Sequence, residues 1–104
     1  MMTVVSLVTR CDSRETLMHV AAEVVERRLA ACAHVRGPIE SVYRWQGVVT
    51  QAQEWELDAL TTAERSEELQ KLVEQQHPYE TPAVVVTPVT VSSSYGEWLR
   101  AQCS

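Results

Sequence analysis

The short segment HPYETP places three chemically active side chains among two prolines. His77, Tyr79 and Glu80 lie where a helical pattern gives way to an apolar run, next to Pro78 and Pro82. Pro78 disfavours the α conformation at His77, and Pro82 favours an extended residue before it. The imidazole, the phenol and the carboxylate are therefore displayed on a stiff connector. Such a connector can offer polar groups to a ligand, although a corner between a helix and a strand needs similar residues for structural reasons alone.

His77 is the best candidate for a metal ligand in this chain. Neutral imidazole suits copper and zinc, and a thiolate suits copper(I). A metal site needs about three or four protein ligands, and the companions that the sequence offers are Cys11 and Glu80. The competing interpretation is a histidine at a helix C-terminus, where the macrodipole favours the imidazolium and backbone groups bond to it. Under the first interpretation the cofactor is copper or another divalent metal.

All six aromatic residues carry a polar atom, because the chain has three Trp, three Tyr and no Phe. Such residues favour interfaces and pocket walls, where the polar atom finds a partner. Tyr43 and Trp45 share one face of a predicted strand, since side chains alternate with period two. Packing between subunits and a ligand-lined cleft between subunits both fit this pattern. The residues predicted for the cleft are Tyr43, Trp45, Glu54, Trp55, Tyr79 and Trp98.

Glu54 and Glu56 alternate with Trp55 and are expected to point to one face of a sheet together. Paired carboxylates can perform acid and base chemistry when their surroundings separate their pKa values. They can also bind a hard cation. The alternative is ion pairing with Arg36 or Arg44 on the neighbouring strand.

Length and composition indicate one ordinary globular domain spanning residues 1–104. The net charge of -5 argues against a nucleic acid as the main partner, because such binding depends on Lys and Arg neutralising phosphates. No apolar run is long enough for a membrane span. The three cysteines are widely spaced with no CxxC pair, which favours reduced thiols in the cytoplasm over a disulfide framework. Cys103, beside the C-terminus, is expected to be exposed.

The first half of the chain predicts a strand, a helix and a long hairpin. Residues 3–9 are rich in β-branched residues and indicate a buried strand. Asp12 and Glu15 have the spacing of a capping box, which predicts a helix that runs to about Ala30. Residues 33–45 and 48–60 then form two strands that meet at a tight turn on Gly47. The Gly-Pro pair at 37–38 is expected to bend or bulge the first of these strands.

The second half predicts a helix, an edge strand and a final short helix. Thr61 and Glu64 offer a second capping box, for a helix that ends at His77. Residues 83–91 form a strand that Pro88 places at a sheet edge or a bulge. The last helix begins near Ser94 and is expected to show Tyr95, Trp98 and Leu99 on one face.

The resulting order is βαββαβ plus a terminal helix, which is the ferredoxin-like α+β arrangement. Right-handed crossovers predict an antiparallel sheet with both main helices on one face and the other face open. Hairpin arms of ~13 residues at ~3.3 Å each are longer than usual. One small domain cannot cover such arms and an open face, so the pattern predicts an oligomer.

Four segments, in this order, resemble the CutA family of divalent-cation tolerance proteins. They are ERRLAACAHVRGPIESVYRWQG at residues 26–47, EWE at 54–56, HPYETP, and a closing tyrosine followed by WL. The resemblance covers nearly the whole chain. It implies a cytoplasmic homotrimer that is assembled like PII signal proteins and is associated with tolerance of copper and other divalent metals. It also implies that the protein is not an enzyme and that it binds a metal ion or a small ligand.

The copper ligands proposed for that family are only partly present in this chain. Where the family has a cysteine near the end of the first strand, this sequence has Val8, with Cys11 three residues on. A pair of histidines at the end of the second helix reads Gln76-His77 here. The lysine that usually ends the third strand is Thr61. These departures weaken the prediction of a metal site and leave the predicted fold unchanged.

Two other functions share the same element order. A PII-like signalling protein would bind a small anionic metabolite in clefts between subunits. An acylphosphatase-like phosphatase would need an arginine in a glycine-rich phosphate loop after the first strand. The loop here is TRCDSRE, which has Arg10 and Arg14 but no glycine. The binding or signalling module is therefore favoured over the enzyme.

Overall fold

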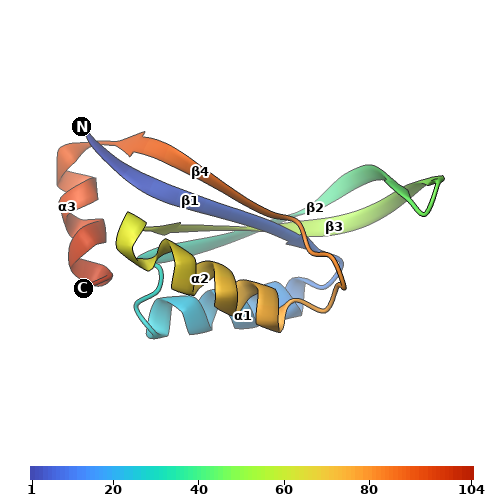
Figure 1. The fold of residues 1–104 in the computed structure, drawn as a ribbon, viewed down its shortest axis with the longest axis horizontal. Helices are drawn as coiled ribbons and strands as arrows, with labels where there is room; N and C mark the ends of the chain where they lie inside the picture. Colours follow the sequence, from blue (N-terminus) through green and yellow to red (C-terminus); the bar gives the residue numbers. More distant parts are fainter.

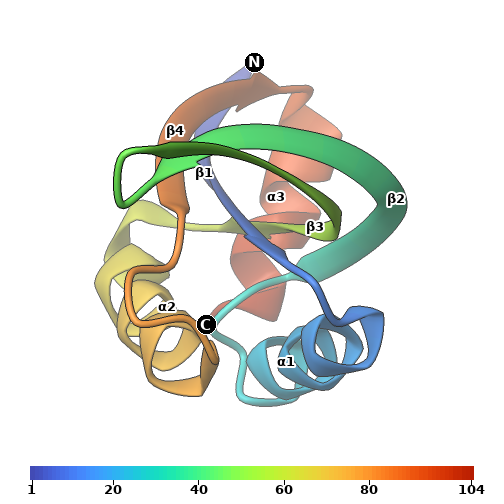
Figure 2. The same cartoon turned by 90° about the vertical axis from the view of Figure 1, so that its right-hand side faces the viewer.

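A four-stranded antiparallel sheet with the strand order β2-β3-β1-β4 forms the centre of the structure (Figure 1). This computed structural model describes residues 1–104. The elements are β1 (Met2–Cys11), α1 (Arg14–Glu26), β2 (Cys32–Trp45), β3 (Val48–Thr61), α2 (Ala63–Gln76), β4 (Val84–Val91) and α3 (Ser93–Gln102). Helices α1 and α2 lie side by side on the same side of the sheet (Figures 1 and 2). The predicted ferredoxin-like arrangement is confirmed. None of the helices has the length and apolar character that crossing a membrane requires.

The main core lies between the sheet and the two long helices. Leu7 and Cys11 of β1 and Leu57 of β3 are fully buried on the helix side, as the period of two predicts. Leucines and valines at helical spacing on α1 and α2 complete this layer. The helix residues in this core are Leu17, Val20, Ala21, Val24, Leu69, Leu72 and Val73.

The other face of the sheet is covered at one end by α3. The side chain of Val4 points to the opposite face of the sheet from Leu7, and it packs with Leu99 of α3 and with Cys103. Of the three residues predicted to share a face of α3, Leu99 is fully buried, whereas Tyr95 and Trp98, which stack on each other, are 36% and 45% exposed. Cys103 was expected to be exposed and is buried, because the end of α3 folds back over the sheet.

The β2-β3 hairpin extends well beyond the helices, at the right in Figure 1. Its turn is formed by Gln46 (φ 47) and Gly47 (φ 82), the two positive values that a two-residue hairpin turn of type I′ needs. Both arms have 14 residues, and a register shift between Arg36 and Ile39 marks the expected bulge at the Gly-Pro pair. The extension raises the radius of gyration to 14.3 Å, compared with about 13 Å for a compact domain of this length.

The two predicted capping boxes were wrong by one residue each. Ser13, not Asp12, caps α1, and its hydroxyl accepts a hydrogen bond from the backbone N–H of Thr16 at 3.1 Å. That helix ends at Glu26, four residues before the predicted end, because Arg28 turns the chain with φ 60. Thr61 is the last residue of β3, and Thr62 occupies the cap position of α2.

Candidate ligand-binding pocket

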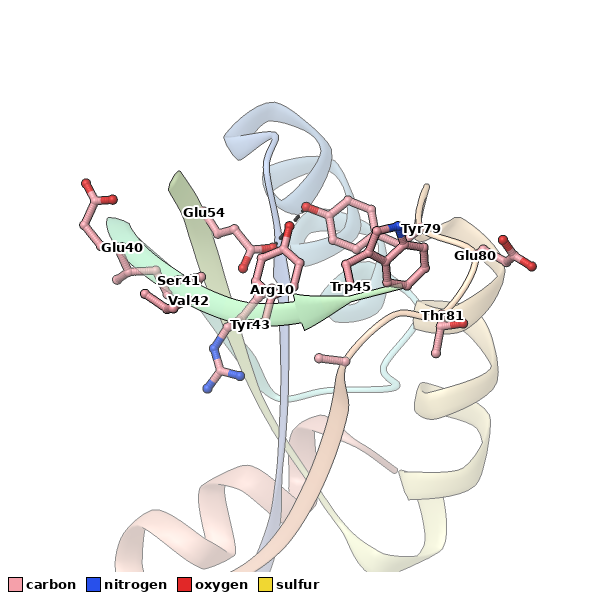
Figure 3. Close-up of a pocket in the computed structure, with 12 residues that line it drawn as sticks. Arg10, Glu40, Ser41, Val42, Tyr43, Trp45, Glu54, Tyr79, Glu80 and Thr81 are labelled. Atoms are coloured by element: carbon pink, nitrogen blue, oxygen red, sulfur yellow. Dashed lines mark hydrogen bonds between the residues drawn. The ribbon is translucent and has the colours of Figure 1, made fainter. Parts of the chain in front are cut away.

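A pocket with a volume of about 620 Å³ lies where the hairpin leaves the body of the domain. Its walls come from β2 and β3, from the end of β1 and from the connector between α2 and β4 (Figure 3). The connector carries the HPYETP segment, and Tyr79 of this segment is hydrogen-bonded to Glu54 at the base of the hairpin. The lining residues are Arg10, Ile39, Glu40, Ser41, Val42, Tyr43, Trp45, Glu54, Tyr79, Glu80, Thr81 and Ala83.

Tyr79 joins the connector to the sheet at this pocket. Its hydroxyl donates a hydrogen bond to Oε2 of Glu54 at 3.0 Å and accepts one from the backbone N–H of Asp12 at 2.9 Å. Burial, followed by the hydrogen bond and the charge of Glu54, raises the pKa of Tyr79 above its ordinary range. The phenol is therefore held as a neutral donor to the glutamate.

Glu56 holds two arginines on the same face of the sheet as Glu54. Its Oε2 accepts from Nε of Arg10 at 2.9 Å, and its Oε1 accepts from Arg36 on the neighbouring strand. Cross-strand register explains this triplet, because Glu56 is directly opposite both arginines. The predicted pairing with Arg36 is thus observed for Glu56. Arg44 instead donates to the carbonyl of Gly47 in the turn.

Both ring nitrogens of His77 form hydrogen bonds to the backbone, and these bonds hold the α2-β4 connector against the end of β1. Nε2 lies 2.7 Å from the carbonyl oxygen of Arg10, and Nδ1 accepts from the backbone N–H of Tyr79 at 3.1 Å. A carbonyl oxygen only accepts, so the hydrogen is on Nε2 and the lone pair of Nδ1 is engaged by Tyr79. Neither nitrogen of the neutral ring is left for a metal ion.

The three predicted metal ligands do not assemble into a metal centre. Cys11 is fully buried, its thiol donates to Oδ1 of Asp12 at 3.7 Å, and burial raises the pKa of the thiol. Glu80 is exposed at the edge of the pocket. The structure contains no group of three or more His, Cys, Asp or Glu side chains arranged to hold a metal ion. The contacts of His77 and Cys11 therefore do not fit a metal site built on them.

The structure divides the predicted cleft residues into three groups. Tyr43, Trp45, Glu54 and Tyr79 line the pocket together. Trp55 points to the helix side and packs against the main core. Trp98 lies on α3, at the far end of the sheet from the hairpin, and stacks on Tyr95 with ring centroids 5.6 Å apart (Figure 1).

Some lining residues were missed by the sequence analysis as members of this pocket. Ile39 and Ser41 share the alternation of Tyr43 and Trp45 on β2, and Arg10 precedes Cys11 at the end of β1. The period of two from Tyr43 could have indicated Ile39 and Ser41. No sequence signal places Arg10 there, because its position follows from the pairing of β1 with β3.

The fold and pocket together define a class of protein: a ferredoxin-like α+β domain with an extended hairpin and a pocket at the base of that hairpin. The sequence model of the CutA1 divalent ion tolerance protein family matches residues 5–102. The chain therefore belongs to the CutA1 family.

Individual members of the family resemble this chain in sequence and in structure. The chain is 38% identical over 89 residues to a divalent-cation tolerance protein from Thermus thermophilus, covering 85% of this chain and 86% of the relative. It is 36% identical over 99 residues to one from Escherichia coli, covering 92% and 88% of the two chains. A solved CutA1 structure from Thermus thermophilus superimposes with a TM-score of 0.90 at 36% identity, over 99% of this chain and 100% of the other.

A more distant solved relative, from Archaeoglobus fulgidus, is described as a periplasmic divalent cation tolerance protein. It superimposes with a TM-score of 0.91 at 25% identity, over 99% of this chain and 100% of the other. The fold is thus the same at both levels of identity.

Proposed function

We propose that this protein is a non-catalytic homotrimer that acts in divalent-metal tolerance and captures a cation in the pocket beside Glu54. Membership of the CutA1 family supports the role in tolerance, since relatives carry that description. The observation that carries the choice of ligand charge is the buried carboxylate of Glu54 in the pocket wall. The carboxylates of Glu40 and Glu80 point outward from the ends of the lining (Figure 3), and the single basic residue of the lining, Arg10, is already paired with Glu56.

This charge distribution favours a cation over the anionic metabolite of a PII-like signalling protein. An anion would meet the buried carboxylate of Glu54, while the one guanidinium of the lining is engaged by Glu56. The phosphatase alternative has less support still. Of the two arginines in the TRCDSRE loop, Arg10 is held by Glu56, and the loop has no glycine to bind phosphate.

The trimer is supported by apolar surface on the extended hairpin. Val42, Trp45, Val48 and Val49 are each at least half exposed. The strands at both edges of the sheet, β2 and β4, leave backbone groups without a strand partner. Association of copies through hairpins and edges covers both features at once. We place this trimer in the cytoplasm, because all three cysteines are free thiols.

Light scattering after size-exclusion chromatography tests the assembly. We expect a mass of about 35 kDa, three times the 11.7 kDa of one chain. A stable monomer at micromolar concentration, with turnover of an acyl phosphate, would instead support the enzyme.

Titration under reducing conditions tests the position of the site. Copper(I) and zinc are added to the wild type, to His77→Ala and to Glu54→Gln, and the heat of binding is measured. We expect His77→Ala to keep the affinity of the wild type, because both ring nitrogens are engaged within the chain, and Glu54→Gln to lose affinity. The reverse pattern would return the site to His77 and its predicted companions Cys11 and Glu80.

A further inference from the structure

Glu54 is a buried carboxylate whose hydrogen bonding is incomplete within one chain. The residue is only 8% exposed, and its carboxylate lies in the pocket wall beside Tyr79 (Figure 3). The hydroxyl of Tyr79 donates to Oε2, whereas Oε1 accepts no hydrogen bond and the carboxylate takes part in no ion pair. Glu56, on the same face and 7% exposed, has an arginine on each oxygen. Burial without a full set of donors is costly, so we expect the missing donor to come from outside this chain.

Trp98, at the other end of the sheet, presents a donor that has no acceptor. Its side chain is 45% exposed on α3 and stacks on Tyr95, and its indole N–H makes no hydrogen bond within the chain. Exposed tryptophans are enriched at contacts between proteins, where the ring fills a pocket and the N–H finds a partner. The hairpin and α3 lie at opposite ends of the sheet (Figure 1), so Trp98 cannot reach the pocket of its own chain.

The two free edges of the sheet run in directions that bring these groups together between copies. Strand β2 runs toward the hairpin tip, whereas β4 runs toward α3 (Figure 1). Neither has a strand partner on its outer side, and every neighbouring pair in the sheet is antiparallel. Antiparallel pairing of the hairpin arm at residues 39–45 with β4 of a second copy places the end of that β4 near Ile39. Ile39 is directly opposite Glu54.

Helix α3 of the second copy comes to the same place and lies on the same face of the sheet. It begins at Ser93, two residues after β4 ends. It covers the face that carries Glu54, because Leu60, which has the same parity on β3, packs in the cluster of Leu99. Two sheets joined by this antiparallel pair keep one strand order, so their α3-bearing faces are turned to one side. The pairing therefore puts Trp98 of the second copy near the open side of the pocket.

We propose that Trp98 of a second copy closes the pocket at the hairpin base, with its indole N–H donating to Glu54 and its ring facing Tyr43 and Trp45. This inference rests on the trimer of the proposed function and names the wall of the pocket that one copy lacks. Contact between opposite ends of two copies is head-to-tail, which closes a ring of three instead of a two-fold dimer. A cation in the completed pocket gains one more aromatic face.

The indole N–H resonance of Trp98 in the assembled protein tests the proposal. Trp98→Phe identifies this resonance by its disappearance. We expect Glu54→Gln to shift it, although the two residues lie at opposite ends of one chain, because the charge of the acceptor is lost from a bond between copies. Glu67→Gln removes an exposed carboxylate from α2 and is expected to leave the resonance unchanged. An unchanged Trp98 resonance in trimeric Glu54→Gln would overturn the proposal.

The exchange of subunits between trimers gives a second measurement. Normal protein and protein with a heavy-isotope label are mixed, and native mass spectrometry follows the appearance of mixed trimers. Trp98→Ala is expected to speed exchange about tenfold or more, because an aromatic anchor is lost from the contact. Trp98→Phe keeps a ring on Tyr95 and is expected to speed exchange less, so a loosened α3 is not needed for the effect. Glu97→Gln, at an exposed position beside Trp98, is the control and is expected to exchange as the wild type does.

The remaining outcomes separate this inference from the proposed function. A monomeric wild type overturns both the trimer and the closing of the pocket by Trp98. A trimer in which Trp98→Ala exchanges at the wild-type rate overturns this inference alone and leaves the trimer standing. A shift of the Trp98 resonance in Glu54→Gln supports the completed pocket whether or not zinc or copper(I) binds there.

Discussion

The hydroxyl of Tyr79 donates a hydrogen bond of 3.0 Å to Oε2 of Glu54, and this bond joins the α2-β4 connector to the base of the hairpin. Burial first, and then Glu54, raises the pKa of Tyr79 above its ordinary value of 10.0. The folded state therefore holds this proton more tightly than the unfolded chain does. The resulting contribution to stability is present below about pH 10 and is lost as the pH rises further.

The first prediction follows from that relationship. The free energy of unfolding of the wild type is expected to fall between about pH 10 and about pH 11, and to fall less steeply in Tyr79→Phe, which has no proton to lose. Urea unfolding at a series of pH values and one protein concentration measures both slopes. Parallel slopes would show that Tyr79 does not hold its proton more tightly in the folded state.

The second prediction concerns Tyr95 on α3. Its hydroxyl lies 3.2 Å from Sγ of Cys32. This contact first, and then burial, raises the pKa of Tyr95 to about 12. We expect Cys32→Ala to lower that pKa toward the ordinary value of 10.0, since the largest cause is removed. The ultraviolet absorbance of tyrosinate, with Tyr95→Phe as the reference for the other tyrosines, measures the change. An unchanged titration of Tyr95 in Cys32→Ala would assign the shift to burial and to the charge of Asp58.

The third prediction compares two fully buried threonines. The hydroxyl of Thr61 donates to the carbonyl oxygen of Leu29 at 2.6 Å, whereas the hydroxyl of Thr9 has no partner. Thr61→Val leaves a carbonyl without its donor and is expected to cost about 1–3 kcal/mol. Thr9→Val removes an unsatisfied polar atom at nearly constant volume, so it is expected to be neutral or stabilising. Denaturant unfolding of both variants gives the comparison, and equal losses would contradict it.

The fourth prediction compares two glycines of the hairpin. Gly37 has φ +149, and a Cβ built there would lie 2.6 Å from Cδ1 of Trp55. Gly47 has φ +82 in the turn, with no atom near its missing Cβ. Gly47→Ala is expected to cost about 1–2 kcal/mol, from backbone strain alone. Gly37→Ala must also displace Trp55 from the core, so we expect a larger loss of thermal stability and a change in near-ultraviolet circular dichroism. A smaller loss at Gly37 than at Gly47 would contradict this contact.

The fifth prediction tests the hairpin as the surface of association. Trp45 is 50% exposed near the hairpin tip, and Met18 is 43% exposed on α1. If hairpins join the copies, Trp45→Glu places a charge in the contact and is expected to lower the mass measured by light scattering. Met18→Glu is the control and is expected to keep the mass of the wild type. Loss of assembly in both variants, or in neither, would exclude the hairpin as the main contact.

Most of the fold could be predicted from local patterns. Alternation and β-branching identified the strands, and the Gln46-Gly47 pair identified the turn, because these signals depend on neighbours in sequence. The helix starts were less well predicted, since Ser13 and Asp12 are equally able to cap, and only the path of the backbone selects one of them. Cys103 was misplaced because its burial depends on where α3 meets the sheet.

The candidate site could be predicted only in part. The shared face of Tyr43 and Trp45 followed from the period of two. Tyr79 was predicted to join them in a cleft between subunits. That it meets them within one chain, from a connector more than thirty residues later, did not follow from any local rule.

The sequence by itself determined the order of the elements and the face to which each strand residue points, since both depend on short-range spacing. Its four motifs also carried the resemblance to the CutA family, which the family model over residues 5–102 then showed. Only the tertiary structure decided what the polar groups do. Glu54 and Glu56 have the same type and the same parity, yet one is left without a cation and the other holds two. The reason is register: β1 and β2 place arginines opposite Glu56, whereas Glu54 lies opposite Ile39 and receives its hydrogen bond from Tyr79 on the α2-β4 connector. Both ring nitrogens of His77 are likewise engaged by backbone groups. One of these is the carbonyl of Arg10, which is 67 residues away in sequence and lies beside His77 only in the folded chain.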